Sequence, residues 1–321
     1  MKKRLFELIG VAALALATLA ALSACGEEVT TTNAATEPPH VHEYRENIVE
    51  PTVDTRGYIE QVCECGDVTS TEYFGIAERD ENPLVLFVGN SYTHYNDMHQ
   101  IFRRVVSGQG IEISTYAVTK GGHTLLEFAD PNDADGKKLT TYLASKDPNY
   151  IFLQEQSERP AKNPALFYDG VRKISEKLSG EDAEIILYQT WGRKEPHTTL
   201  TSNGWTHETM AYKLAASYEA IAEEMGYALS PAGSAFLDVY VNHPEINLFD
   251  ADRTHPSPTG SYLVALCHYA TLYGFSPIGV EYTMNLPTET VEVLQRAAHD
   301  AVFGESIVPE EYRTSSVGVG S

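Results

Sequence analysis

Residues 84–98 read LVLFVGNSYTHYNDM, and this stretch decides the fold. The apolar run 84–88 stops abruptly at Gly89, Asn90 and Ser91. A short apolar run bounded by a turn signal favours a buried strand. Parallel α/β sheets place their ligand sites at the carboxyl ends of the strands. The pattern therefore predicts that Ser91 is presented at the carboxyl edge of a sheet.

Strand-like and helix-like runs alternate over residues 83–305. The expected strands span 84–88, 111–117, 150–153, 184–189 and 228–231. The expected helices span 98–106, 165–178, 208–225 and 287–301, with a further helix from Pro258 after an N-cap at Ser257. Such alternation indicates a parallel sheet covered by helices on both faces. The predicted fold class is α/β, a three-layer α/β/α sandwich with a mostly parallel sheet, preceded by a small N-terminal β module.

The N-terminus is not expected to belong to the fold. Three basic residues at 2–4 precede the apolar stretch 8–22, which is shorter than the roughly 20 residues of a membrane span. The stretch runs into LSACG at 22–26, which resembles the lipobox of bacterial lipoproteins. The resemblance implies that residues 1–24 are a lipoprotein signal peptide and that Cys25 is lipidated. The alternative is an ordinary secretory signal. Either interpretation predicts an extracytoplasmic protein, held at the cell membrane by acyl chains in the first case.

Residues 25–39 are rich in Thr, Ala and Glu and show no apolar period, which predicts a flexible tether. The whole chain has a formal charge of −22, and removal of residues 1–24, which carry a net +2, leaves −24. This acidity argues against binding to nucleic acid or adsorption to anionic lipid. We expect membrane attachment through the lipid anchor only.

Residues 40–78 form a separate segment with a Cys-x-Cys pair. The segment resembles a short repeat of Firmicutes surface proteins, His-x-Tyr, Pro-Thr-Cys, Gly-Tyr and Cys-x-Cys-Gly, although Val53 replaces the first cysteine. The candidate ligands of a structural zinc ion are Cys63, Cys65 and either His42 or His40. The alternative is a β-hairpin without metal. The remaining cysteine, Cys267, lies in an apolar helical stretch and is expected in the core.

Two polar motifs far apart in the chain suggest acyl transfer. A serine hydroxyl such as that of Ser91 needs a base within hydrogen-bond reach to act as a nucleophile. Asp252 precedes His255 by three residues, and a tight turn would let its carboxylate accept a hydrogen bond from the imidazole Nδ1–H. The alternatives are that Ser91 only caps a helix and that Asp252 and His255 lie on a solvated loop.

These blocks together resemble the SGNH hydrolases, the GDSL-type lipases and esterases, and within them a branch whose first block reads Gly-Asn-Ser-Phe/Tyr-Thr. The resemblance implies a flavodoxin-like SGNH hydrolase fold over residues 83–305, followed by a C-terminal tail, 306–321. It implies that Ser91 is the nucleophile, His255 the base and Asp252 its partner. No metal or cofactor is needed for this chemistry.

The oxyanion donors are also implied by the resemblance. The expected donors are the backbone N–H groups of Ser91 and Gly122, with Gly121 as the alternative to Gly122. The family's third donor is an Asn side chain, but the corresponding strand end here carries Gln154 and Gln156. We expect Gln154 to supply the amide because it ends the strand, with Gln156 as the alternative.

The resemblance leads to a prediction of function. The expected protein is a secreted, lipid-anchored serine ester hydrolase that removes short acyl groups, acetyl in particular, from carbohydrate. The expected substrate-binding residues are Tyr92, Asn96, His123 and Trp191, with Tyr95 and Trp205 as further candidates. Trp191 could instead be a core residue. The alternative functions are a lipase or thioesterase and a non-catalytic glycan-binding surface lipoprotein. The sequence leaves the oligomeric state open.

Overall fold

The computed structural model describes residues 41–49, 57–74 and 82–313. The expected signal peptide 1–24, the tether 25–39 and Cys25 lie outside the described residues. Within the described residues, no helix combines the length and the apolarity that a membrane span requires.

The N-terminal module is an antiparallel sheet of three strands, β1 (Tyr44–Val49), β2 (Gly57–Cys63) and β3 (Val68–Phe74). The strands lie in the order β1-β2-β3. The turn between β2 and β3 is closed by a 2.8 Å hydrogen bond from the Cys63 N–H to the Asp67 carbonyl. The expected small β module is therefore present, with three strands instead of a hairpin.

A second sheet has five strands, all parallel. They are β4 (Leu84–Gly89), β5 (Ser114–Thr119), β6 (Tyr150–Leu153), β7 (Glu184–Tyr188) and β8 (Ala228–Ser230). Their order is β5-β4-β6-β7-β8, the order of flavodoxin-like folds. The chain reverses direction across the sheet at β4, so the carboxyl ends of β4 and β6 flank the point where such folds bind ligands.

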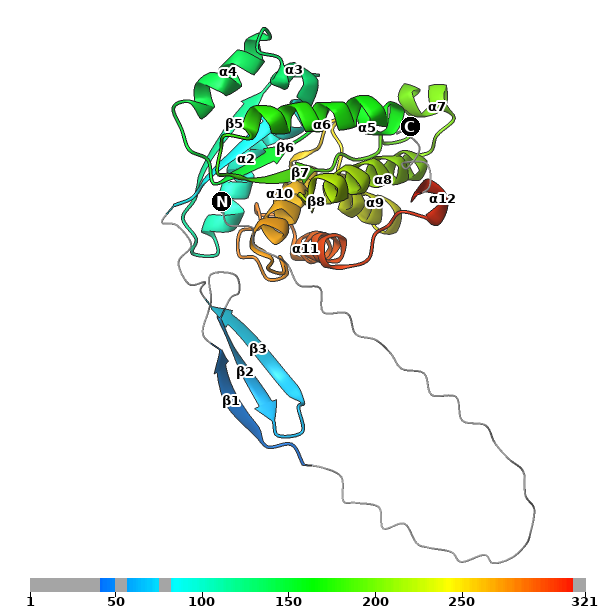
Figure 1. The fold of residues 1–321 in the computed structure, drawn as a ribbon. Coiled ribbons are helices and arrows are strands. Elements are labelled where there is room, and N and C mark those ends of the chain that lie inside the picture. The colour runs from blue at the N-terminus through cyan, green and yellow to red at the C-terminus, as the bar shows by residue number, and fades with distance from the viewer. Residues whose placement is uncertain (1–40, 50–56, 75–81, 314–321) are drawn as a thin grey trace, which may run out of the picture. The chain divides into compact units, whose positions relative to one another are not determined.

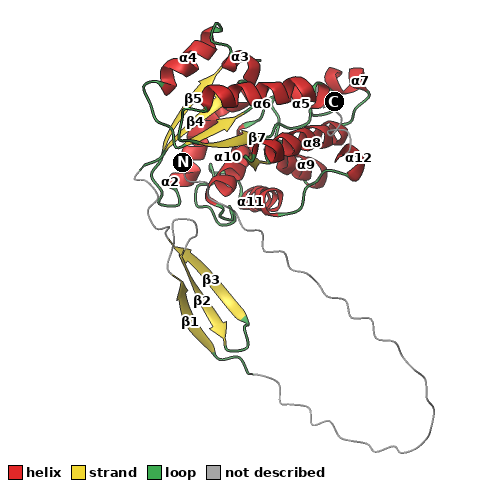
Figure 2. Ribbon diagram, in the orientation of Figure 1, coloured by secondary structure: helices red, strands yellow, loops and turns green. Residues whose placement is uncertain are grey.

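Helices cover both faces of this sheet because its strands alternate their side chains. Val85 and Phe87 of β4 pack in one core with α2 (Met98–Ser107), α9 (Ala232–Asn242), α10 (Pro258–Tyr273) and α11 (Thr288–Phe303). Leu86 and Val88 pack in a second core with α3 (Leu125–Ala129), α4 (Ala134–Leu143), α6 (Pro164–Leu178) and α8 (His207–Met225). Figure 1 shows α3, α4 and α6 on one side and α10 and α11 on the other. The predicted three-layer α/β/α sandwich is confirmed (Figure 2).

Some boundaries differ from the prediction. The strand expected to start at residue 111 starts at Ser114, because the register pairs Ser114 with Leu84, the first residue of β4. Several helices of one or two turns were not predicted, since so short a segment shows no period: α1 (Ser91–His94), η1 (Tyr95–Asp97), α5 (Arg159–Lys162), α7 (Thr198–Asn203) and α12 (Glu310–Arg313). Packing also continues past residue 305, because Val308 is buried.

Gly89 allows the chain that follows β4 to lie against the end of β6. A Cβ atom at this position would lie 2.5 Å from Thr93 Oγ1 and 2.7 Å from Gln154 Oε1. Both distances are shorter than real Cβ contacts. Glycine is therefore required where the strand delivers Ser91 to the sheet edge.

Candidate active site

Ser91 is the first residue of α1 and lies directly after the carboxyl end of β4. The preceding residue, Asn90, caps the helix, and its Oδ1 accepts a 3.2 Å hydrogen bond from the Tyr92 N–H. The Ser91 Oγ lies 2.8 Å from Nε2 of His255, a residue 164 positions further along the chain. The structure thus brings the expected nucleophile and the expected base into hydrogen-bond contact.

His255 ends a turn in which the Asp252 side chain accepts hydrogen bonds both from the backbone and from the His255 ring. Oδ1 of Asp252 accepts the N–H groups of Thr254 and His255, each at 2.9 Å. Oδ2 lies 2.5 Å from Nδ1 of His255. A carboxylate can only accept from the ring, so Nδ1 carries the proton and Nε2 is left to accept from the Ser91 hydroxyl. The three groups form one continuous hydrogen-bond chain.

The electrostatics of Asp252 agree with this role. Partial burial works to raise the pKa of Asp252, but the hydrogen bonds from the His255 ring and from the N–H groups of His255 and Thr254 outweigh it. The net pKa lies below its ordinary value, so the carboxylate stays charged. Its side chain is nevertheless 46% exposed, whereas that of His255 is 20% exposed.

The turn that carries His255 is tied to the end of β7. The indole N–H of Trp191 donates a 3.2 Å hydrogen bond to the Thr254 carbonyl, and the Lys194 N–H donates a 3.0 Å bond to the Arg253 carbonyl. Arg253 itself has a φ of 62°, a left-handed conformation that a tight turn demands. These contacts hold the turn that carries His255 against the segment that follows β7.

The prediction that Tyr92 and Trp191 bind substrate is wrong, because both rings are buried. Tyr92 is 1% exposed and Trp191 is 0% exposed. Their rings stack at a centroid distance of 4.1 Å, and Trp191 stacks in turn on Phe236 at 4.2 Å. The two side chains support the loops of the site from inside the core and have no surface to offer a sugar.

The other expected substrate contacts remain predictions. The side chain of Asn96 is a donor to the Pro256 carbonyl and to Ser261 Oγ, each at 2.9 Å. The ring of His123 lies 3.1 Å from Asp133 Oδ1 and is 13% exposed. Trp205 packs against a small apolar cluster of α7 and α8. None of these contacts tests a role in binding.

The two backbone N–H groups expected to receive the oxyanion are not used by other hydrogen bonds in the part of the chain that the structure describes. Among the described residues, no hydrogen bond uses the N–H of Ser91 or of Gly122. Gly122 is exposed and has a φ of 75°, which favours glycine. Its turn is closed by a 3.1 Å bond from the His123 N–H to the Lys120 carbonyl. The expected donors at Ser91 and Gly122 are therefore available; Gly121, which is also exposed, stays the alternative.

Gln154 does not fit the expected role of a third oxyanion donor. The side chain is fully buried, and its Oε1 accepts from the Asn90 N–H at 2.9 Å and from Thr93 Oγ1 at 2.8 Å. Its Nε2 donates to Asn90 Oδ1 at 3.0 Å and to the Glu155 carbonyl. Both amide protons are thus used inside the protein. Gln156, which is half-buried, retains an amide proton and stays the candidate.

Sequence reasoning missed the part that Asn90 plays beside Ser91. Its Nδ2 donates to the His123 carbonyl at 3.0 Å and to the Glu155 carbonyl at 3.3 Å. Its Oδ1 accepts from the Tyr92 N–H and from Gln154. The one side chain therefore joins the nucleophile turn, the turn that carries Gly122 and the end of β6. The position of Asn90 directly before Ser91 was a signal that it belongs to the site. Its hydrogen-bond partners could not be predicted, because they come from other segments of the chain.

Glu155 is a buried carboxyl behind the site. Burial raises the pKa of Glu155 to about 7, although the N–H groups of Gln156 and Leu125 and the charge of Arg159 oppose the rise. The folded protein then holds a proton that the unfolded chain, with an ordinary pKa of 4.5, releases between pH 4.5 and 7. The free energy of unfolding should therefore fall by about 3 kcal/mol as the pH rises through this window.

Glu155→Gln should flatten this pH dependence, because the amide does not titrate. Urea unfolding at pH 5 and pH 8 would measure it, with the exposed Glu176→Gln on α6 as the matched control. We expect the control to keep the wild-type slope. An equal slope in Glu155→Gln would contradict the assignment.

In the N-terminal module, Cys63 is buried and Cys65 is exposed. Their sulfur atoms lie within 4.8 Å of each other. His42 stands two residues before Tyr44, which pairs with Cys63 in the register of β1 and β2. His40 lies outside the described residues. Zinc binding stays a prediction, and elemental analysis of the purified protein would test it.

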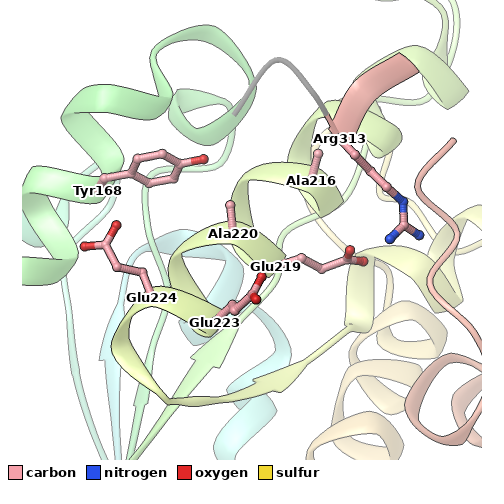
Figure 3. A pocket seen from close by; sticks show the side chains of 7 residues that line it. All are labelled: Tyr168, Ala216, Glu219, Ala220, Glu223, Glu224 and Arg313. Carbon is pink, nitrogen blue, oxygen red and sulfur yellow. The ribbon is translucent and has the colours of Figure 1, made fainter. Parts of the chain in front are cut away.

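A cavity of about 550 Å³ lies elsewhere, between α6, α8 and α12 (Figure 3). Its lining residues are Tyr168, Ala216, Glu219, Ala220, Glu223, Glu224 and Arg313. Glu219 already accepts a hydrogen bond from Ser306, and Glu224 is paired with Arg172. None of the candidate catalytic residues lines this cavity, so it is separate from the site at the sheet edge.

Comparison with known proteins identifies the fold. No family model matches the chain, and no curated protein matches it. Among solved structures, a provisionally assigned SGNH hydrolase from Slackia heliotrinireducens is 27% identical, with a TM-score of 0.52 over 60% of this chain and 99% of that one. A DUF4886 family protein from Bacteroides uniformis is 16% identical, with a TM-score of 0.60 over 71% of this chain and 98% of that one. The main domain thus has the SGNH hydrolase fold, and the likeness supports that superfamily; the Gly-Asn-Ser branch stays a prediction.

Proposed function

We propose that the protein is a serine ester hydrolase, anchored outside the cytoplasm, that removes short acyl groups, acetyl in particular, from carbohydrate. One observation carries the enzyme class. The hydroxyl of Ser91, the imidazole of His255 and the carboxylate of Asp252 form an unbroken hydrogen-bond chain at the carboxyl edge of the sheet. A binding protein has no use for a serine held in this way.

The mechanism follows from the protonation states. Ser91 Oγ attacks the ester carbonyl while Nε2 of His255 takes its proton, and Asp252 stabilises the imidazolium that forms. The N–H groups of Ser91 and Gly122 receive the oxyanion, and loss of one such donor typically lowers the rate about 10²- to 10³-fold. His255 then protonates the leaving alcohol. Water, activated by the same ring, releases the acid and restores Ser91.

The surface around the site supports a short acyl group and a polar alcohol. The exposed large apolar side chains of the described main domain lie in other segments: Tyr116, Leu166, Val241, Ile278 and Phe303. The segments that carry the site expose polar side chains instead, among them those of His94, Lys120 and Arg253. A long acyl chain would need an apolar groove here. A hydroxyl-rich alcohol such as a sugar suits the polar surface better.

A chain-length series tests this proposal. We expect kcat/KM for p-nitrophenyl acetate to exceed that for p-nitrophenyl octanoate at least tenfold. We also expect the enzyme to release acetate from members of a panel of acetylated oligosaccharides. A preference for the octanoate would favour the lipase or thioesterase alternative. Equal rates of the wild type and Ser91→Ala on every ester would favour the non-catalytic glycan-binding alternative.

The proposed membrane anchor rests on the residues around Cys25. Metabolic labelling with a palmitate analogue should label the full chain in a bacterial host, and Cys25→Ala should remove the label and release the protein from the membrane fraction. Labelling that survives Cys25→Ala would count against the anchor. The esterase proposal does not depend on this result.

A further inference from the structure

The ring of Tyr95 lies flat on the imidazole of His255. The two ring centroids are 4.0 Å apart, and the planes differ by 6°. Tyr92 meets the same imidazole only by an edge, at 5.9 Å and 75°. His255 is therefore held between Asp252 at one nitrogen and Ser91 at the other, with an aromatic face along its plane.

The backbone after Tyr95 adopts an unfavourable conformation that keeps the ring there. Asn96 and Asp97 have φ values of 55° and 51°. Two consecutive left-handed residues that are not glycine are uncommon, because each is energetically costly for a side chain with a Cβ atom. The surrounding contacts must supply that energy.

Those contacts reach across the chain to the segment of His255. Nδ2 of Asn96 donates to the Pro256 carbonyl and to Ser261 Oγ, each at 2.9 Å. Pro256 is the residue after His255. The loop that contains Tyr95 and Asn96 therefore binds the backbone of the histidine segment through Asn96 and stacks on the histidine ring through Tyr95. The chain from Tyr95 to Asp97 acts as a clasp, the name we use for it below.

We propose that Tyr95 is a positioning residue, which holds the His255 ring in line with Ser91 and stabilises the imidazolium formed during acyl transfer. The inference rests on the proposed esterase function. An aromatic face attracts a cation more than a neutral ring, so the stack strengthens when His255 takes the proton. An interaction that is stronger in the transition state raises kcat and leaves KM unchanged.

Tyr95→Leu and Tyr95→Phe separate this role from simple packing. Leucine fills part of the space without a π face, and we expect kcat for p-nitrophenyl acetate to fall about two- to tenfold with KM unchanged. Phenylalanine keeps the face, and the described residues provide no hydrogen-bond partner for the Tyr95 hydroxyl. Tyr95→Phe should therefore stay within about twofold of the wild type.

An NMR measurement tests the stack without relying on activity. A ring stacked over the imidazole shifts the Cε1 proton of His255 upfield, and His255→Asn identifies that signal among the 11 histidines of the chain. Tyr95→Leu should move the signal downfield by several tenths of a ppm, whereas Tyr95→Phe should not. Absence of esterase activity in the wild type would sink the proposed function but leave this shift as evidence for the stack.

The clasp offers a second variant in case Tyr95→Leu does not fold. Asn96→Gly removes both hydrogen bonds and relieves the left-handed strain. It should lower kcat and move the His255 signal in the same direction, because the loop is released. An unchanged kcat together with an unmoved His255 signal, in either Tyr95→Leu or Asn96→Gly, would overturn the proposal.

Discussion

Ser91→Ala should lower kcat/KM for an acetyl ester by about 10⁴-fold or more, the largest effect that we expect of any substitution. The hydroxyl oxygen is the atom that bonds to the acyl group, and it lies at hydrogen-bond distance from Nε2 of His255, the base. Only the oxyanion donors and substrate binding remain, and these give a small residual rate. Hydrolysis of p-nitrophenyl acetate measures the change.

His255→Ala should lose as much, and the double variant should lose no more than either single one. Residues that act as one unit show this lack of additivity. A fluorophosphonate should add one adduct to the wild type and none to Ser91→Ala. Ser145→Ala, on an exposed serine, provides the matched control and should keep both the rate and the label. A Ser91→Ala variant with the wild-type rate would exclude the mechanism.

The catalytic residues could be predicted because each of their sequence patterns lies within one short segment. These patterns are the apolar run before Ser91 and the three-residue step from Asp252 to His255. The fold could be predicted for a related reason, since the alternation of strands and helices is a local pattern. The short helices at the sheet edge show no period, so they could not be read in advance.

The failures concern residues whose partners come from distant segments. Tyr92 and Trp191 are of the types that stack on sugars, but the same rings fill cores equally well, and only the fold places Phe236 beneath them. Gln154 ends its strand as expected, yet its amide group already donates to Asn90 Oδ1 and to the Glu155 carbonyl. The stack of Tyr95 on His255 joins residues 160 positions apart, and nothing in either segment signals the other.

Asn90→Asp should destabilise the protein by about 3–5 kcal/mol, because it removes two buried hydrogen-bond donors and sets a carboxylate oxygen against the carbonyls that accept from them. Asn90 is 2% exposed, and its Nδ2 donates to the carbonyls of His123 and Glu155. A carboxylate would turn an oxygen toward both carbonyls and could donate to neither. For a domain of this size the melting temperature should fall by about 6–20 °C.

The same change made on the surface controls for the chemistry of the substitution. Asn203→Asp alters an exposed amide at the end of α7 and should leave the melting temperature within about 2 °C. The melting temperature of Asn90→Asp should lie closer to that of the wild type at pH 5, since protonation of the new carboxylate removes the buried charge. At temperatures where the variant is still folded, its activity should also be lower than that of the wild type, because the bond from Asn90 to the His123 carbonyl anchors the turn that carries Gly122. A variant as stable as the wild type at pH 8 would show that Asn90 is not needed as an amide, and the account of how the two turns are joined beside Ser91 would fail.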